Sequence, residues 1–157
     1  MARYFSYLLF LCAAAFGVRA QNFDINAVEV EVNMNPARYR TLLDRFERAD
    51  TTLSAGELAL VYFGYAFTPE YVPFESFANV QTAYEVADYM RAEQLAADAL
   101  KLNPVSLELS VIALASADHL RGEGGFGRKI LDYGTRCDFI ATAILSSGSG
   151  TSAASPF

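Results

Sequence analysis

The amino-acid sequence predicts an all-α fold: five or six helices in antiparallel pairs, with an extended arm on the N-terminal side. Apolar residues recur at positions i, i+3, i+4 and i+7 over most of residues 35–146, which is the period of amphipathic helices. Capping residues, prolines and glycines stand where one such pattern stops and the next begins. Only Cys137 follows the first 20 residues, so packing, and not a disulfide within the chain, must hold the fold.

The first 20 residues have the features of a secretory signal peptide. Arg3 supplies a positive start, residues 4–18 are almost uncharged and apolar, and Val18 and Ala20 are the small residues that a signal peptidase recognises. The apolar run is shorter than the about 17–25 residues of a membrane-spanning helix, which favours a cleaved signal over a retained anchor. We therefore expect cleavage after Ala20, an exported protein that works outside the cytoplasm, and no membrane association after cleavage.

The charge of the chain argues against several classes of partner. The full chain has 12 Lys and Arg against 18 Asp and Glu, a net charge of −6. Arg3 and Arg19 would leave with the signal peptide, which gives −8 (10 − 18) for residues 21–157. Nucleic acids and anionic lipids are bound through Lys and Arg, so an acidic chain without a basic cluster suits neither. No nucleic-acid partner is expected.

Residues 21–34 open the mature chain with an alternating pattern. Val28, Val30 and Val32 alternate with Glu29 and Glu31, which is the period of a strand. The run is short. We therefore expect an extended arm that lies on the helices.

Two helices are predicted next. Asn35 suits an N-cap and Pro36 suits the first helical position. After a short turn, Ser54 and Glu57 form a capping box that starts a helix of about residues 55–66. This second helix is apolar nearly all round, so it should be the most buried one. The stripe of the first helix consists of Tyr39, Leu42, Leu43 and Phe46.

Residues 67–78 interrupt the helical pattern. Pro69 and Pro73 exclude a regular helix interior. The residues around them are aromatic or apolar, so this loop should pack onto the core. Burying a phenylalanine side chain contributes roughly 1.5–3 kcal/mol, and the three expected to be buried are Phe63, Phe67 and Phe74.

Helical patterns resume near residue 79 and continue as a pair of helices to Asn103. Ala92, Ala99 and Pro104 have the spacing of the second helix of a tetratricopeptide repeat, where small residues let paired helices approach closely. The first helix of the pair lacks the usual Trp, Leu, Gly and Tyr positions. The segment is therefore tetratricopeptide-like and not a true repeat.

Two more helices complete the predicted domain, over residues 104–121 and about 126–146. Three glycines between residues 122 and 125 mark the turn that joins them. The end of the chain is rich in Ser, Gly and Ala and should be flexible. The expected organisation is a signal peptide at 1–20, an arm at 21–34, a helical domain at 35–146 and a tail at 147–157.

Four segments resemble a family of domains of unknown function in exported proteins of Gram-negative bacteria. They are the turn Asp-Thr-Thr-Leu at 50–53, the aromatic block Tyr-Phe-Gly-Tyr-Ala-Phe-Thr-Pro-Glu-Tyr-Val-Pro-Phe at 62–74, the helix end Ala-Leu-Lys-Leu-Asn-Pro at 99–104 and the turn Ser-Gly-Ser-Gly at 147–150. The resemblance covers roughly residues 35–150, and the aromatic block is its most specific part. The resemblance implies a mainly helical domain that is periplasmic or secreted in a Gram-negative bacterium, and it implies no known reaction.

The chain departs from this family pattern at two points. Ser149 stands where the family usually carries Asp. Family members also continue beyond this turn with a β-like stretch, whereas the sequence here stops at Phe157. The final piece is expected to be short or lost, which leaves a truncated, nonfunctional paralogue as one interpretation.

Common catalytic and metal-binding patterns are missing from the sequence. His119 is the only histidine, and with Cys137 it gives too few ligands for a zinc site. There is no Gly-x-Ser-x-Gly motif to go with His119 as a base. The glycines at 122–127 lack the Gly-Lys-Ser/Thr of a phosphate-binding loop and indicate a turn between helices. We expect no catalytic residues, no bound metal and no cofactor.

The aromatic loop holds the candidate binding residues Tyr65, Glu70, Tyr71 and Glu75. Glu70 and at least one of the two tyrosines should stay partly exposed, because an unpaired glutamate is rarely buried. The leading hypothesis is an exported, noncatalytic helical domain that binds a protein or peptide partner in the cell envelope. The alternative is an enzyme acting on cell-envelope glycans through Glu70 and Glu75, which would require two carboxylates in one cleft.

Overall fold

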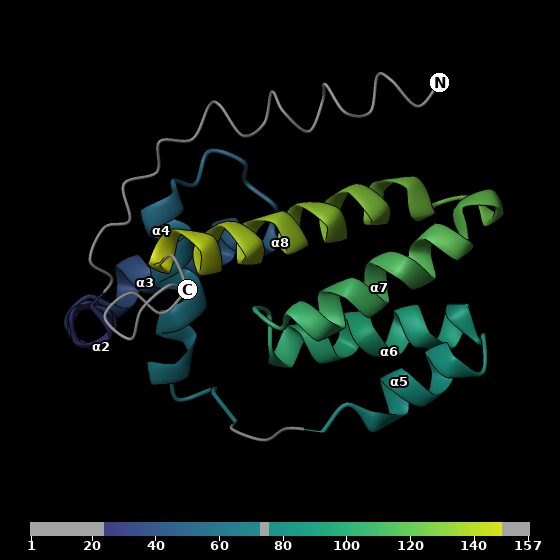
Figure 1. The fold of residues 1–157 in the computed structure, drawn as a ribbon, viewed down its shortest axis with the longest axis horizontal. Helices are drawn as coiled ribbons and strands as arrows, with labels where there is room; N and C mark the ends of the chain where they lie inside the picture. Colours follow the sequence, from purple (N-terminus) through teal and green to yellow (C-terminus); the bar gives the residue numbers. More distant parts are fainter. Residues whose placement is uncertain (1–23, 73–75, 149–157) are drawn as a thin grey trace.

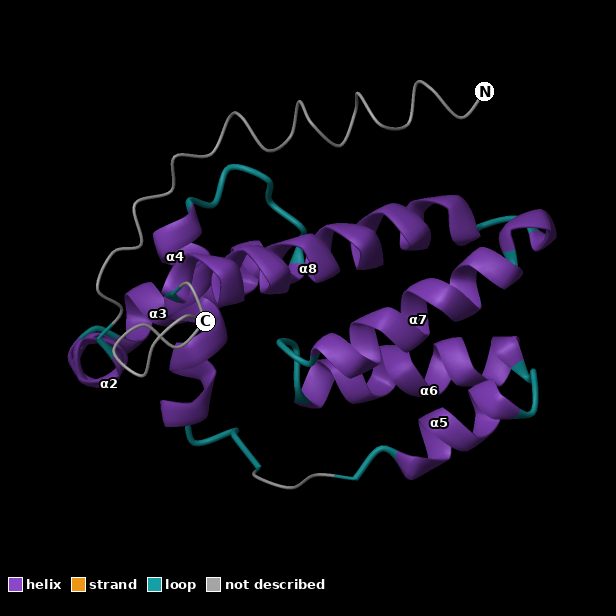
Figure 2. Cartoon of the chain, viewed as in Figure 1, coloured by secondary structure: helices purple, strands orange, loops and turns teal. Residues whose placement is uncertain are grey.

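The computed structural model describes residues 24–72 and 76–148, and within them the fold is all-α, as predicted. Figure 2 shows helices joined by loops, and the described part of the chain contains no strand. The signal peptide, Phe74, Glu75 and residues 149–157 lie outside the described residues. The described residues form seven α-helices: α2 (Ile25–Met34), α3 (Pro36–Glu47), α4 (Ala55–Gly64), α5 (Ala78–Glu85), α6 (Tyr89–Leu102), α7 (Leu107–His119) and α8 (Phe126–Ser147). They also form 3₁₀ turns at Tyr65–Phe67 and Arg121–Glu123.

Except for α4 and α5, described helices that follow one another in the chain pack against one another. The most extensive contacts join α6 to α7 and α7 to α8 (Figure 1). The last helix, α8, also packs along α4, so it connects the α2–α4 end of the molecule to the α5–α7 end. None of the helices in the described ranges is long and apolar enough to cross a membrane.

The main core lies where α3, α4 and α8 meet. Phe46 and Ile140 have no exposed surface there, and the rings of Phe46 and Phe139 lie with their centroids 5.6 Å apart. A second cluster joins α5, α6 and α7. It is built around small residues, since Ala96 and Ala113 are completely buried. The alanine spacing of residues 92–100 therefore serves close helix packing, as the sequence indicates, although α5 has only eight residues.

The extended N-terminal arm is a wrong prediction over Ile25–Met34, which form α2. The side chain of Asp24 accepts a hydrogen bond from the backbone N–H of Asn26 and so caps the helix. Val28 and Val32 are buried, whereas Val30 is 59% exposed. Residues four apart share one face of a helix as well as one face of a strand, so the alternation of valines did not distinguish the two.

The Asp-Thr-Thr-Leu turn between α3 and α4 is a structural motif. Asp50 accepts hydrogen bonds from the N–H of Thr52 at 3.0 Å, from its hydroxyl at 2.6 Å, and from Arg45 Nε at 2.8 Å. Hydrogen bonds from Thr52, and then from Arg45, hold the pKa of the Asp50 carboxyl far below its usual value of 3.8. The capping box of Ser54 and Glu57 follows directly, as predicted.

Replacing Asp50 with alanine is expected to lower the melting temperature at pH 7. A carboxyl whose pKa is lowered by folding stabilises the fold above its unfolded pKa, near 3.9, and loses this effect as the pH falls through its folded pKa. The difference in melting temperature between the wild type and Asp50→Ala should therefore shrink below about pH 4. Thermal unfolding of both proteins at pH 7 and pH 2.5 measures this difference in melting temperature. The same difference at both pH values would contradict the role of the carboxylate.

Gly64, in the aromatic block, lies where three helices approach closely. A Cβ atom at this position would stand 2.8 Å from Val32 Cγ2 in α2 and 2.8 Å from Tyr39 Cε2 in α3. Both neighbours belong to a buried cluster and have little room to move. The glycine in this block is therefore required by packing and not by backbone conformation.

Gly64→Ala is expected to lower the free energy of unfolding by about 1–3 kcal/mol, because the added methyl group overpacks the contact with Val32 and Tyr39. Gly56→Ala, at the start of the same helix, is the matched control, since a Cβ there meets nothing within 4 Å. That substitution should be neutral or stabilise by up to about 1 kcal/mol, because alanine favours helix more than glycine does. Urea denaturation of both variants compares them, and equal stabilities would contradict the packing argument.

Candidate functional site

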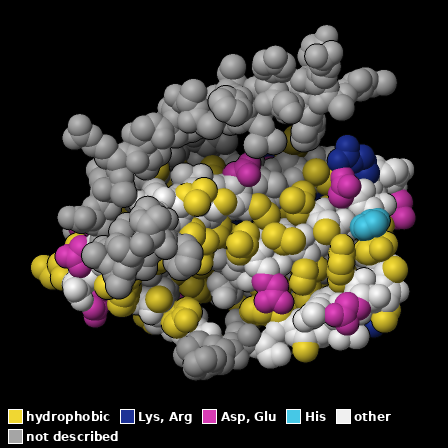
Figure 3. All heavy atoms as spheres, viewed as in Figure 1, with side chains coloured by type: hydrophobic (Ala, Val, Ile, Leu, Met, Phe, Trp, Pro, Cys, Tyr) yellow, Lys and Arg dark blue, Asp and Glu magenta, His cyan; other side chains and the backbone are white. Residues whose placement is uncertain are grey.

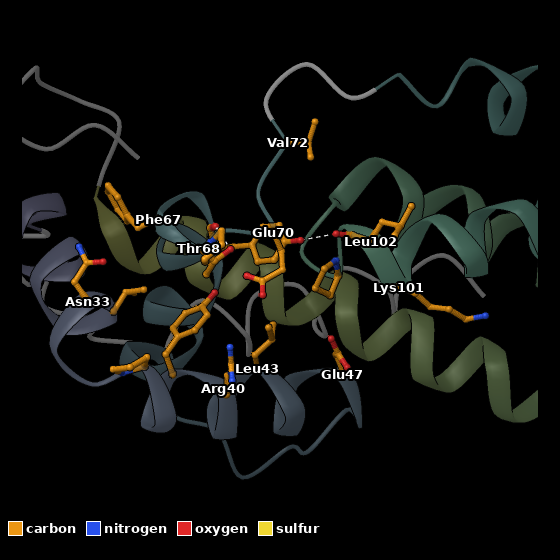
Figure 4. Close-up of a pocket in the computed structure, with 16 residues that line it drawn as sticks. Asn33, Arg40, Leu43, Glu47, Phe67, Thr68, Glu70, Val72, Lys101 and Leu102 are labelled. Atoms are coloured by element: carbon orange, nitrogen blue, oxygen red, sulfur yellow. Dashed lines mark hydrogen bonds between the residues drawn. The ribbon is translucent and has the colours of Figure 1, made fainter.

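A groove of about 780 Å³ lies between α3, the end of α2, the aromatic loop and the end of α6. Figure 4 shows the side chains that line it. Pro36, Tyr39 and Leu43 come from α3, and Phe67 and Pro69 come from the loop. Leu102 and Pro104 close the groove from the turn between α6 and α7. Its walls are therefore mostly apolar and aromatic, which is typical of a binding site.

Two buried tyrosines hold the walls in place. The hydroxyl of Tyr39 donates to the carbonyl of Val61 in α4 at 3.0 Å, and the hydroxyl of Tyr65 donates to the carbonyl of Leu102. Burial, and to a lesser extent Tyr65 and Glu70, raises the pKa of Tyr39. The Tyr39 phenol thus remains a protonated donor at neutral pH. The two hydrogen bonds join α3 to α4 and the loop to α6.

Charged side chains border the groove. The carboxylate of Glu70 reaches into the cavity from the loop, opposite Arg40 and Leu43 (Figure 4). With the residues that the structure describes, neither Glu70 nor Arg40 forms a hydrogen bond or an ion pair through its side chain. Lys101 also borders the groove, but it pairs with Asp98 at 2.7 Å.

Glu47 is the second carboxylate of the groove. Its pKa is raised mainly by burial and further by Asp44, while Arg136 opposes the shift. Arg136 donates its hydrogen bond to the backbone carbonyl of Glu47, at 2.8 Å, and not to the carboxylate. The Glu47 carboxylate therefore stays available to a ligand.

The candidate residues from the sequence are only partly brought together. Tyr65 and Glu70 line the groove, but Tyr65 is just 4% exposed and forms a wall. Tyr71 is partly exposed and packs edge-on against Tyr65, with ring centroids 6.2 Å apart, beside a smaller pocket of about 400 Å³. The predicted exposure of Glu70 is confirmed. Glu75 lies outside the described residues.

The predicted burial of Phe63 and Phe67 is wrong, because both side chains are only half-buried. They pack at the edge of the cluster formed by Val28 and Val32 of α2 and Tyr39 of α3, which leaves part of each side chain accessible to solvent. Phe74 lies outside the described residues.

Sequence reasoning missed Arg40 and Glu47, which lie outside the predicted apolar stripe of the first helix. They stand seven positions apart with Leu43 between them, so all three share one face of α3. That spacing is a usable signal for a mixed polar and apolar strip. It does not show that the aromatic loop, some 25 residues later in the chain, faces this strip.

The other side chains that could bind a metal or take part in catalysis do not form a second site among the described residues. No group of three or more His, Cys, Asp or Glu side chains in the described ranges could hold a metal ion. His119 is exposed and stacks on Tyr89, with ring centroids 3.9 Å apart. Burial raises the pKa of Cys137, so its thiol is protonated and unreactive at neutral pH. Lys129, after the glycine turn, binds Glu93 and is not available to a phosphate.

The visible surface agrees with the acidic composition. On the face shown in Figure 3, apolar side chains gather across the middle, acidic side chains are scattered among them and basic side chains are few. Such a surface does not offer the basic stripe that a nucleic acid would require.

Comparison with known proteins places the chain in one family. No curated protein and no solved structure matches it. The sequence pattern of DUF4919, a domain of unknown function, matches residues 26–157. This match begins earlier than the four motifs, whose resemblance starts near residue 35. It therefore includes most of α2, the helix that packs on Gly64. The protein belongs to the DUF4919 family.

Proposed function

We propose that this protein is an exported, noncatalytic helical domain that binds a segment of a protein or peptide partner in the cell envelope through the groove beside α3. The observation that carries the proposal is the groove itself, whose apolar walls stand next to Arg40 and Glu70. Apolar walls supply affinity by burying surface, at about 25 cal/mol per Å². A few polar groups fix the orientation of the ligand.

The rigidity of the walls supports a binding role. Tyr39 and Tyr65 anchor the two sides of the groove through hydrogen bonds to carbonyls of neighbouring elements. Ordering these walls costs nothing when a ligand arrives, because they are already fixed in the fold. The tetratricopeptide-like pair α5–α6 would act as a rigid support at one end of the groove.

Export is the second part of the proposal, and it rests on the signal-like residues 1–20. Mass spectrometry of the protein recovered from a producing Gram-negative cell should find an N-terminus at Gln21. An intact Met1 on a membrane-retained product would contradict export with cleavage after Ala20.

Site-specific photocrosslinking in the producing cells tests the groove. The photoreactive amino acid p-benzoylphenylalanine replaces Val72 or Leu102, which line the groove and are 57% and 63% exposed. Leu131 is the matched control, because it is 68% exposed and lines neither pocket described above. We expect discrete protein adducts from positions 72 and 102 and none from position 131.

Adducts at all three positions would indicate nonspecific contact, and no adduct at positions 72 and 102 would argue against a protein partner in the groove. Either result would overturn the proposal. The crosslinked partner, identified by mass spectrometry, should also be lost when Glu70 or Arg40 is changed to a residue of opposite charge.

Glycan hydrolysis is the second candidate function. It is favoured by one observation: Glu70 and Glu47 line the same groove, and the pKa of Glu47 is raised, as a general acid requires. The second carboxylate would thus be Glu47 in place of Glu75. Release of soluble fragments from purified peptidoglycan by the wild type, and its loss in both Glu47→Gln and Glu70→Gln, would establish this function. Equal release by the variants would exclude it.

A further inference from the structure

The charged and apolar side chains of α3 follow one another in a fixed order along the groove. Arg40, Leu43 and Glu47 line it from the same helix face, in the order cation, apolar residue, anion (Figure 4). A helix rises about 1.5 Å per residue, so roughly 10 Å of groove separate the backbones of Arg40 and Glu47. A ligand lying along α3 would meet these three environments in sequence.

The opposite wall gives the groove more negative than positive side chains. Glu70 comes from the aromatic loop and adds a second carboxylate, and the described residues offer no ion pair to it or to the carboxylate of Glu47. Asp44, one turn before Glu47, adds further negative potential there. The cation Lys101 at the rim is already paired with Asp98. Among the described residues that line the groove, Arg40 is therefore the cation left for an anionic group of a ligand.

We propose that the groove recognises an extended peptide segment that presents a basic side chain to Glu47 and an acidic group to Arg40, with Glu70 on the opposite wall adding to the negative potential that the basic side chain meets. An extended chain advances about 3.3 Å per residue, so the two charges of the ligand should stand about three residues apart. Apolar residues between them would cover Leu43 and the ring of Tyr39. This inference rests on the proposed function of the groove and defines the class of peptide that it takes.

Charge complementarity favours this occupant over others. An anionic polymer would meet two carboxylates for each guanidinium and would be repelled. A fully apolar segment would leave the lining charges without partners as they lose water, which costs free energy. A segment of mixed charge with apolar residues in the middle satisfies both requirements.

Fluorescence anisotropy with synthetic peptides tests the inference on the full exported chain. The probe is a fluorescein-labelled peptide, Ser-Ala-Glu-Val-Leu-Lys-Ala-Ser, and two comparison peptides carry Gln in place of its Lys or its Glu. We expect saturable binding of the probe, with about 3–10-fold weaker binding when Lys is replaced and a smaller loss when Glu is replaced. Raising NaCl from 0.05 to 0.5 M should also lower the affinity of the protein for the probe, because salt screens the charge interactions.

Charge-reversal variants locate the contact. Glu47→Lys should weaken binding of the probe about 3–10-fold or more and make the Lys-to-Gln replacement in the peptide nearly neutral. Glu70→Lys should weaken binding of the probe and reduce the effect of that replacement. Arg40→Glu should do the same for the Glu-to-Gln replacement. Both Glu70 and Arg40 are exposed and have no ion pair with described residues, so their variants should fold. Glu123→Lys, an exposed control at the far turn before α8, should leave binding unchanged.

Three outcomes would overturn the inference. Equal binding of all peptides by all variants would show that the groove does not recognise the charges of the peptide. An equal loss in Glu123→Lys would show a nonspecific effect of net charge. No binding of the probe to a wild type that still forms groove crosslinks at positions 72 and 102 would leave the proposed function standing and remove this ligand class. Charge-dependent binding without groove crosslinks in cells would instead support the ligand class and remove the cell-envelope partner.

Discussion

Tyr65→Ala is expected to lower the free energy of unfolding by about 3–5 kcal/mol and the melting temperature by roughly 10 °C. The side chain is 4% exposed, belongs to the main core with Phe46 and Val61, and donates its hydroxyl to the carbonyl of Leu102. Its removal would leave a cavity between α4 and the turn that precedes α7. Because Tyr65 also forms a wall of the groove, partner crosslinks at position 72 should disappear. Circular dichroism during thermal and urea unfolding measures the loss.

Tyr65→Phe separates the ring from the hydroxyl. The ring and its packing remain, while the carbonyl of Leu102 loses its donor, so the expected loss is only about 1 kcal/mol. A Tyr65→Ala variant as stable as Tyr65→Phe would show that the ring does not hold the core together. In that case the groove would not depend on the position of this side chain.

The role of Tyr65 could have been predicted from the period of its helix. Leu58, Val61 and Tyr65 stand at i, i+3 and i+7, so they share one face, and all three are buried. Our prediction instead gave the buried positions to Phe63 and Phe67, because phenylalanine is the more apolar side chain. These two lie on another face of the same segment, at the edge of the cluster of Val28, Val32 and Tyr39, and are only half-buried. Helical period decided burial here, and side-chain type did not.

Helix boundaries were predictable because local chemistry sets them. Ser54 and Glu57 cap each other across one turn, and the residue before Pro104 ends α6, as the sequence indicates. The N-terminal helix was not predictable from its valines, since Val28 and Val32 fit both periods. The decision came from tertiary packing against Tyr39, a contact that the local pattern does not contain.

The groove was predictable only in part, because the local sequence pattern does not contain its tertiary contacts. The sequence pointed to Glu70 and its loop, because an aromatic block around two prolines is unusual. It did not show that Arg40 and Glu47 from α3 complete the site, because the approach of the loop to α3 is a long-range contact. Such contacts depend on how α2, α3 and α4 pack, which the close approach at Gly64 fixes.

Lys129→Met is expected to cost about 3 kcal/mol in the free energy of unfolding, although it lies outside the groove. Glu93, in α6, is 2% exposed, and both its carboxylate oxygens accept from Lys129 Nζ at 2.9 Å. The hydroxyl of Tyr133 donates to the same carboxylate at 2.6 Å. Removing the ammonium group leaves a buried charge with one neutral donor, which typically costs 3–5 kcal/mol. We expect the lower end of this range, because the Lys129 side chain is 46% exposed and water can partly replace it.

The double variant Glu93→Met, Lys129→Met tests whether the penalty comes from the unpaired charge. Replacing both members of a buried ion pair with apolar residues of similar volume is often neutral or stabilising, so the double variant should be more stable than Lys129→Met alone. Tyr133 would then lose its acceptor, which costs about 1 kcal/mol and sets the stability of the double variant slightly below that of the wild type. If the double variant were instead the least stable of the three proteins, the ion pair itself would contribute net stability between α6 and α8. The loss in Lys129→Met would then not come from the unpaired charge of Glu93.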